Sequence, residues 1–285
     1  MPEVFTALIA ATLFTAMLAL GLSLRLEPLV QWCRRPALPL RVLLSSCLLV
    51  PLGGLLLLQS PWSWALSAPV RYGIALMAIC PSAPLAMRRV QKAGADHQLA
   101  ALIQVGAACV AIVTVPLMEL VFRSRFGVEG WIVQPDAIAL QVARVQVLPL
   151  LMGLSLRHGR PGLASRLQRP LDWLASGLLV VMVAVLLIKV SPVLLNFLKT
   201  NGLGLLAIAL MATLALVIGL VVSADQPEHQ TTVMLVTALR NPGLALLLAN
   251  RGGEQIQGLN LAILLYALVT FVITQPLSRR QSALP

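Results

Sequence analysis

Nine apolar segments, separated by short polar ones, run along the chain. Each is about 20 residues long and rich in Leu, Val and Ala, which is the length that a helix needs to cross roughly 30 Å of hydrocarbon. The pattern predicts nine transmembrane helices, at about 4–24, 38–58, 66–87, 98–122, 136–156, 172–192, 202–223, 231–250 and 257–277. We therefore expect an all-α polytopic membrane protein that forms a single transmembrane domain over residues 1–285.

Two of these segments are interrupted by helix breakers. The third contains Cys80-Pro81-Ser82-Ala83-Pro84, and the eighth contains Arg240-Asn241-Pro242-Gly243. Proline removes a backbone donor and disfavours helix at the residue before it. Irregular backbone at membrane depth is tolerated only where it faces protein or a water-filled cavity, so both interruptions indicate a functional site.

The interrupted segments are five spans apart and so cross the membrane in opposite senses. Paired broken helices in the two halves of a chain are typical of an inverted-repeat transporter whose binding site lies near the midplane. We expect substrate or ion contacts from the first interruption, from the second, and from one polar residue of the fourth span: Pro81, Ser82, Ala83, Pro84, Gln104, Arg240, Asn241, Pro242 and Gly243.

Composition and charge agree with a membrane protein. Hydrophobic residues make up 59% of the chain, charged residues 11%, and the mean hydropathy is +0.90. The net charge of +11 does not indicate nucleic-acid binding, because the basic residues lie in loops between apolar segments. Alternate loops carry 13 and 6 of the Lys and Arg residues, which predicts an external N-terminus and a cytoplasmic C-terminus. We expect an integral protein of the bacterial inner (plasma) membrane.

The basic segment 157–169 is expected to be the longest cytoplasmic loop. Clustered cations beside a membrane span can bind anionic lipid headgroups, each contributing about 1 kcal/mol. Membrane lipids are therefore expected partners, although a role in setting topology is by itself a sufficient explanation of this segment.

No catalytic constellation accompanies the spans. The chain has no nucleotide-binding loop, zinc spacing, nucleophile elbow or intramembrane carboxylate pair, so we expect neither an enzyme nor a cofactor or metal. Two residues are candidates for proton coupling. Glu119, which we expect to reach the interface at the outer end of its span, is one, and His97 beside Asp96 is the other unless it is a solvated loop residue.

Three stretches resemble the bile acid:sodium symporter superfamily. They are Met17–Leu24 followed by Pro28, Cys80-Pro81 with the later Lys92–Asp96, and Arg240–Ala245. The resemblance implies a panel domain and a core domain, with two discontinuous helices crossing at the binding site. The resemblance also implies that the chain begins at the position of the family's second helix and lacks the first. The implied panel is about 4–24 and 136–192, and the implied core is about 38–122 and 202–277.

The chain departs from this family at the positions that bind sodium. Relatives carry a Ser-Asn pair where this chain has Ala86-Met87, and a glutamate where it has Val236. Matching the remaining ligands gives Ala100, Gln104 and Ser46, and Arg240 in place of a glutamine. Two unit charges about 4 Å apart at an effective dielectric of about 20 interact by roughly 4 kcal/mol, so a guanidinium here would repel sodium.

We therefore expect transport without the usual sodium coupling, with a proton as the alternative coupling ion. Arg240 either supplies the charge of sodium, by locking the crossing or by pairing with an anionic substrate, or serves architecture alone by binding exposed carbonyls.

The predicted function is secondary transport of a small organic anion by alternating access. One alternative is a receptor or accessory protein that keeps the fold without transport. Another is a metalloid oxyanion exporter, which would use the Cys80 thiol near the first interruption.

Overall fold

The chain forms a bundle of helices in a computed structural model, which describes residues 2–24, 30, 36–82, 84–126, 134–251 and 256–279. No strand occurs among these residues. The elements are α1 Pro2–Ser23, α3 Ala37–Leu44, η1 Ser45–Leu49, α4 Val50–Gln59, η2 Pro61–Ala65, α5 Ala68–Ile79, α6 Pro84–Lys92, α7 His97–Phe126, α8 Pro135–Val142, η3 Ala143–Val147, α9 Leu148–Gly159, α10 Pro161–Thr200, α11 Gly202–Val222, α12 Pro227–Ala238, α13 Pro242–Arg251, α14 Leu259–Ile273 and α15 Gln275–Arg279.

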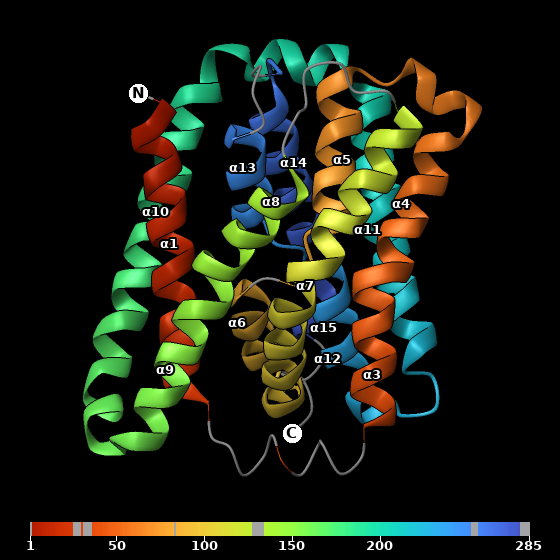
Figure 1. Cartoon of the computed structure of the whole chain (residues 1–285). Coiled ribbons are helices and arrows are strands. Elements are labelled where there is room, and N and C mark those ends of the chain that lie inside the picture. The colour runs from red at the N-terminus through yellow and green to blue at the C-terminus, as the bar shows by residue number, and fades with distance from the viewer. Residues whose placement is uncertain are drawn as a thin grey trace.

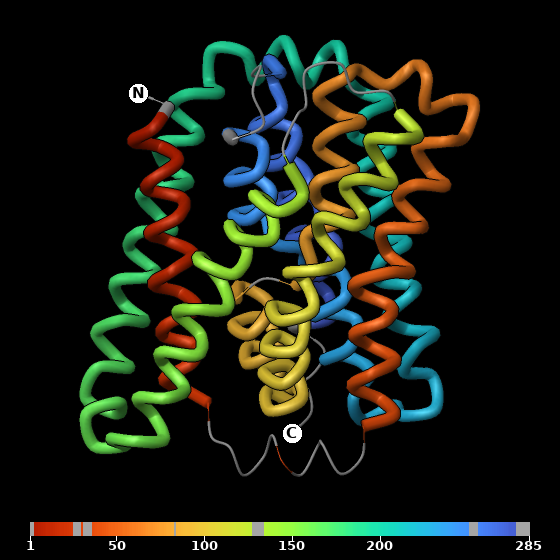
Figure 2. Tube along the Cα trace, in the orientation of Figure 1, coloured from red at the N-terminus to blue at the C-terminus, as the bar shows by residue number. Residues whose placement is uncertain are grey.

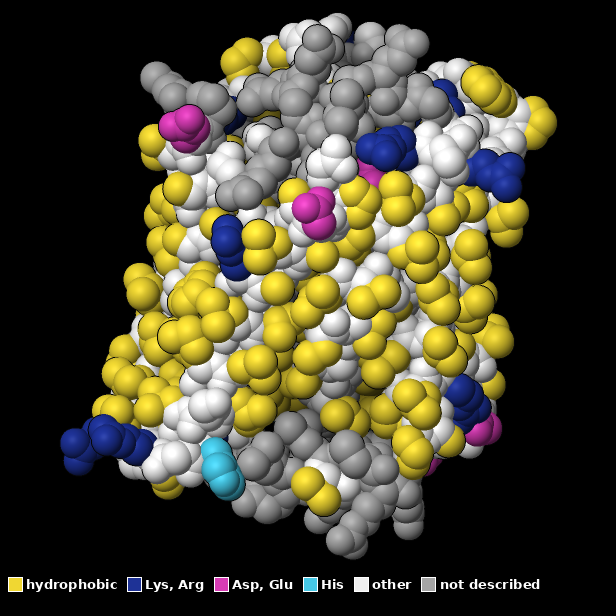
Figure 3. Space-filling view, in the orientation of Figure 1, with side chains coloured by type: hydrophobic (Ala, Val, Ile, Leu, Met, Phe, Trp, Pro, Cys, Tyr) yellow, Lys and Arg dark blue, Asp and Glu magenta, His cyan; other side chains and the backbone are white. Residues whose placement is uncertain are grey.

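The prediction of an all-α polytopic membrane protein is confirmed. Within the described ranges, eight helices are long and apolar enough to cross a membrane, and the bent pair α5–α6 makes a ninth candidate. Apolar side chains form a broad belt around the visible face, and charged groups lie mainly above and below it (Figure 3). Such a belt is the surface that hydrocarbon requires.

The prediction of a long loop at residues 157–169 is wrong. Residues 157–169 are almost wholly helical, because α9 continues to Gly159 and α10 begins at Pro161. Proline at a first helical position needs no backbone donor, so it starts a helix where the sequence suggested a linker. The sixth span is consequently a helix of 40 residues with Pro170 and Pro192 inside it.

A compact group of three helices, α1, α9 and α10, stands at the left of Figure 1. We call it the α1 group. A Cβ added to Gly21 of α1 would lie 2.3 Å from the Leu150 carbonyl oxygen of α9, and one added to Gly153 would lie 2.4 Å from that of Leu18. The two backbones touch because neither glycine has a side chain.

The two broken helices fill the centre of the molecule. In Figures 1 and 2, α5 and α13 lie in the upper half, on the side where α1 begins, and α6 and α12 lie in the lower half. The angle between α5 and α6 is 74°. The segment α12–α13 is the most buried of the candidate spans, whereas α10 is the least. The breaks therefore lie inside protein, as backbone groups without helix partners require.

Candidate functional site

The two breaks meet at mid-height, and we call this meeting point the crossover. It consists of Cys80–Ser82 after α5 and Leu239–Asn241 after α12. The Asn241 backbone N–H donates to the Cys80 carbonyl oxygen at 3.3 Å. The C-terminal ends of α5 and α12 are thereby brought together.

Arg240 is the central side chain of the crossover and is 3% exposed. Its Nε donates to the Met77 carbonyl oxygen at 3.1 Å and its Nη2 to that of Ala78 at 2.6 Å. Its Nη1 donates to Ser46 Oγ at 2.9 Å and to the Thr237 carbonyl oxygen at 3.5 Å. The guanidinium thus joins the last turns of both α5 and α12 to the π-helical turn η1.

The charge of Arg240 is balanced by backbone dipoles. None of the ion pairs among the described residues includes Arg240. A helix C-terminus carries the equivalent of roughly −0.5 charge, so two of them together offset about one positive charge. The ends of α5 and α12 supply these two termini, which explains how a buried cation is accommodated without a carboxylate.

Ser82 and Gln104 complete the first break. Ser82 Oγ donates to Gln104 Oε1 at 2.8 Å, and Gln104 Nε2 donates back to the Ser82 carbonyl oxygen at 3.1 Å. Both residues are buried, so α7 holds the chain as it leaves α5. The predicted Pro81 lies beside them and Pro84 begins α6, whereas Ala83 lies outside the described residues, as does Pro28.

Asn241 caps the helix α13, and Gly243 at its start contacts the α1 group. Asn241 Oδ1 accepts the Leu244 backbone N–H at 3.1 Å and so caps α13, which Pro242 begins. Its buried Nδ2 has no hydrogen-bond partner among the described residues. A Cβ on Gly243 would lie 2.8 Å from Leu13 Cδ2 of α1, so α13 starts in close contact with that helix.

A cavity of about 740 Å³ opens below this contact, between α6 and the α1 group. Pro84 and Ala16 line it near the crossover, and Arg88, Lys92 and His97 line it from α6 and α7. A second cavity, of about 310 Å³, lies on the upper side between α10 and the ends of α13 and α14. Two cavities thus separate the α1 group from the crossover helices, one on each side of the Leu13–Gly243 contact.

Comparison with known proteins assigns the chain to a family. The sequence model of the Sodium Bile acid symporter family matches residues 10–197, which include the first break and most of the α1 group. The chain belongs to the sodium bile acid symporter family. A search of curated proteins finds no match. The matched residues end within α10, so Arg240 lies beyond them.

Membership of the sodium bile acid symporter family makes this a membrane transporter of the bile acid symporter type. No group of three or more His, Cys, Asp or Glu side chains in the described part of the chain could hold a metal ion. The Cys80 thiol is buried at the crossover. Among the described residues, it belongs to no group of His, Cys, Asp and Glu side chains that could hold a metal ion.

The predicted coupling residues of this family member lie in three different places. Ser46 of η1 contacts the crossover, because its Oγ accepts from Arg240. His97 lines the lower cavity. Glu119 follows Gln104 by 15 residues along α7, which is about 22 Å at 1.5 Å per residue. The sequence suggested that Glu119 reaches the interface, but its carboxyl group is buried. Its Oε2 has no hydrogen-bond partner among the described residues.

Sequence reasoning missed two buried hydroxyl groups near Arg240. Thr237 Oγ1 and Tyr266 Oη have no hydrogen-bond partner among the described residues, and the Tyr266 side chain interacts electrostatically with Arg240. Each is a polar residue within an apolar segment, which was the available signal. Only the packing of α14 against α5 and α13 reveals that Tyr266 faces the centre.

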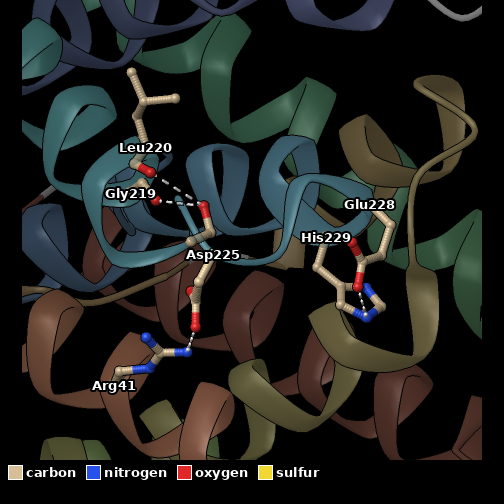
Figure 4. Close-up of polar contacts among 7 residues, drawn as sticks. Arg41, Gly219, Leu220, Asp225, Glu228 and His229 are labelled. Atoms are coloured by element: carbon tan, nitrogen blue, oxygen red, sulfur yellow. Dashed lines mark hydrogen bonds and ion pairs between the residues drawn. The ribbon is translucent and has the colours of Figure 1, made fainter.

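The lower surface carries the charged contacts that tie loops to helix ends. Arg41 Nη2 donates to Asp225 Oδ2 at 2.9 Å (Figure 4), which holds the pKa of that carboxyl below its usual value. Asp96 caps α7 by accepting the Leu99 N–H at 2.9 Å, and its other oxygen lies 3.2 Å from His229 Nδ1. Asp96 therefore pairs with His229 of α12, and the ion pairs among the described residues include none with His97.

Proposed function

We propose that this protein is a secondary transporter of a small organic anion that works by alternating access without sodium coupling. The moving parts would be a panel of about 4–24 and 136–192, which includes the α1 group, and a core of about 38–122 and 202–277. The observation that carries this proposal is Arg240, a buried guanidinium bonded to both crossing segments.

Arg240 supports sodium independence because it uses the acceptors that a cation at the crossover would need. The carbonyl oxygens of Met77, Ala78 and Thr237 all accept from its guanidinium. A sodium ion in the same place would lose these oxygens and face a fixed positive charge. In this proposal, the Arg240 guanidinium permanently provides the positive charge that a sodium ion would provide only while it is bound.

The N-terminal ends of α6 and α13 support an anionic substrate. A helix N-terminus carries partial positive charge, and half-helix N-termini in transporters face anionic groups. Both ends lie beside one turn of α1: Gly243 contacts Leu13, and Pro84 lines the same cavity as Ala16. The unpartnered Asn241 Nδ2 is a further donor at this place. We propose that the substrate's anionic group binds here.

The two cavities support alternating access. The larger one, on the lower side, reaches Pro84. Its lining contains Arg88, Lys92 and Asp172, so its charge is net positive and attracts anions. Arg88 Nη2 also donates to Ser176 Oγ of α10 at 2.6 Å, across the boundary between α6 and the α1 group. We propose that the lower side is cytoplasmic, with an external N-terminus in the plasma membrane, and that this structure corresponds to an inward-facing state.

Flux in proteoliposomes tests the proposal. Purified protein would be reconstituted and supplied with a panel of radiolabelled mono- and dicarboxylates, in sodium buffer and in N-methylglucamine buffer, with protein-free vesicles as the control. We expect saturable uptake of at least one anion at equal rates in both buffers. Arg240→Gln should weaken uptake and binding together if the guanidinium contacts the substrate.

Two results would contradict the proposal. Saturable dependence of uptake on sodium would overturn sodium independence. Substrate-induced thermal stabilisation without any flux would overturn transport and favour a receptor. A pH gradient imposed across the same vesicles identifies proton coupling, for which Glu119 and His97 remain the candidates.

A further inference from the structure

The upper cavity contains a cation that the proposed mechanism has not used. Lys189 of α10 lines this space of about 310 Å³ together with residues from the ends of α13 and α14. The Lys189 ammonium lies 4.3 Å from the centroid of the Phe5 ring of α1. None of the ion pairs in the described part of the chain includes Lys189. An ammonium close to a span end and without a carboxylate partner can pair with a ligand anion.

The wall opposite Lys189 carries a pair of amides. Asn250 Nδ2 donates to Asn260 Oδ1 at 3.1 Å and to the Leu246 carbonyl oxygen at 2.7 Å. Asn260 Nδ2 donates to Asn250 Oδ1 at 3.3 Å. An amide nitrogen carries two hydrogens, so Asn250 uses both and Asn260 keeps one. That remaining N–H is a second donor for an anion.

The rest of the cavity is suited to a small apolar body. Its other lining side chains are mostly aliphatic: Leu186, Val190, Val193, Ile256, Leu259 and Leu261. Its volume lies at the small end of the range of about 300–1,000 Å³ that is typical of ligand pockets. The helix α14 also begins at this cavity without a side-chain cap. A compact organic carboxylate matches these features better than an inorganic ion, which would leave the aliphatic wall exposed.

We propose that the upper cavity is a second anion-binding site, which holds a small organic carboxylate between Lys189 and Asn260. This inference rests on the proposed function. In that mechanism, the upper cavity is the external site that captures the anion before the contact between Leu13 and Gly243 opens. The site joins α10 to α13 and α14, so its ligand would touch both moving parts.

Amine labelling tests this site without measuring flux. The chain has three lysines, Lys92, Lys189 and Lys199, and Lys199 lies on the same helix as Lys189 outside the cavity. Purified protein in detergent would be treated with trinitrobenzenesulfonate, with benzoate as the probe and sodium chloride at equal ionic strength as the control. Peptide mass spectrometry then gives the modification rate of each lysine.

We expect benzoate to slow modification of Lys189 saturably while Lys199 reacts at an unchanged rate. At ten times its dissociation constant, benzoate should slow Lys189 about tenfold. Asn260→Leu removes the spare N–H, and loss of one such bond should weaken protection by about two- to tenfold with Lys189 labelling unchanged in the absence of benzoate. Equal slowing of Lys189 and Lys199, or equal protection by chloride, would overturn the site.

The failure of this site and the failure of transport give different results. Protection of Lys189 in a protein that moves no anion across a vesicle membrane leaves the site intact and contradicts the transport proposal. Saturable benzoate flux without protection of Lys189 contradicts only the upper site.

Discussion

The α1–α9 contact and the crossover are two tight helix junctions built from different chemistry. Between α1 and α9, Gly21 and Gly153 let two backbones touch. At the crossover, Arg240 joins α5 and α12 through three hydrogen bonds to backbone carbonyl oxygens, and a fourth bond links it to Ser46 of η1. The first junction depends on shape alone, and the second depends on a charge. Both cavities lie along the boundary between the α1 group and the crossover helices.

The largest effect is expected at the charged junction. Arg240→Met removes the donor to the carbonyl oxygens of Met77 and Ala78, and each buried acceptor left unpaired costs about 1–3 kcal/mol. The free energy of unfolding should fall by about 2–6 kcal/mol, measured by thermal unfolding in detergent. Arg240→Lys keeps the positive charge but not the planar guanidinium with its several N–H donors. Its loss of unfolding free energy should therefore be intermediate. Equal stability of Arg240→Met and the wild type would show that the charge does not hold the crossover.

The shape-dependent junction should be the next most sensitive. Gly21→Ala places a methyl group 2.3 Å from the Leu150 carbonyl oxygen, and the α9 backbone must move away. We expect a loss of about 1–3 kcal/mol. Gly177→Ala is the matched control, because its Cβ would meet nothing within 4 Å, and alanine favours a helix over glycine by about 0.5–1 kcal/mol. Similar effects of the two substitutions would contradict a junction that depends on close contact between the α1 and α9 backbones.

The boundary between the junctions should respond in function more than in stability. The added methyl of Gly243→Ala meets the Leu13 side chain, at 2.8 Å from Cδ2 and 3.2 Å from Cγ, and that side chain can shift. Asn241 Oδ1, at 3.5 Å, is an ordinary van der Waals contact. We expect the free energy of unfolding to change by less than about 1 kcal/mol. Flux should nevertheless fall if this contact must open and close, whereas a normal rate of uptake would place the moving boundary elsewhere.

The smallest effect is expected at the exposed pair of Arg41 and Asp225. The pKa of Asp225 is lowered by the Arg41 hydrogen bond, so its stabilising contribution is present above the unfolded-state pKa, about 3.9. It is lost as the pH falls through the lower folded-state value. Asp225→Asn should therefore lower the unfolding temperature slightly at neutral pH and by less at a pH well below about 3.9. An equal difference at both pH values would exclude this carboxylate as its source.

The sequence was informative where proline interrupts an apolar segment. Both breaks, the pairing of the two halves and the central position of Arg240 follow from Pro81, Pro84 and Pro242 inside spans. The structure adds which backbone groups Arg240 satisfies, because those carbonyls lie more than 150 residues away in the chain. That Arg240 replaces sodium stays a prediction.

Adjacent cations show what sequence could not resolve. Arg88 and Arg89 looked like equivalent loop residues, yet Arg88 is exposed whereas Arg89 is 6% exposed. The Arg89 guanidinium lies 3.5 Å from the Phe271 ring centroid and donates to the Phe271 carbonyl oxygen. Which of two neighbours is buried depends on how α6 packs, and hydropathy does not report that. The π-helical turns η1 and η3 were missed for the same reason.

The central claim is that Arg240 makes a crossover sodium ion unnecessary. The most direct test is the unfolding temperature of the purified protein as sodium replaces N-methylglucamine at constant ionic strength and pH. A protein that binds an ion only when folded is stabilised by it in a saturable manner. The account predicts an unfolding temperature that does not change with sodium. A saturable rise specific to sodium would contradict it.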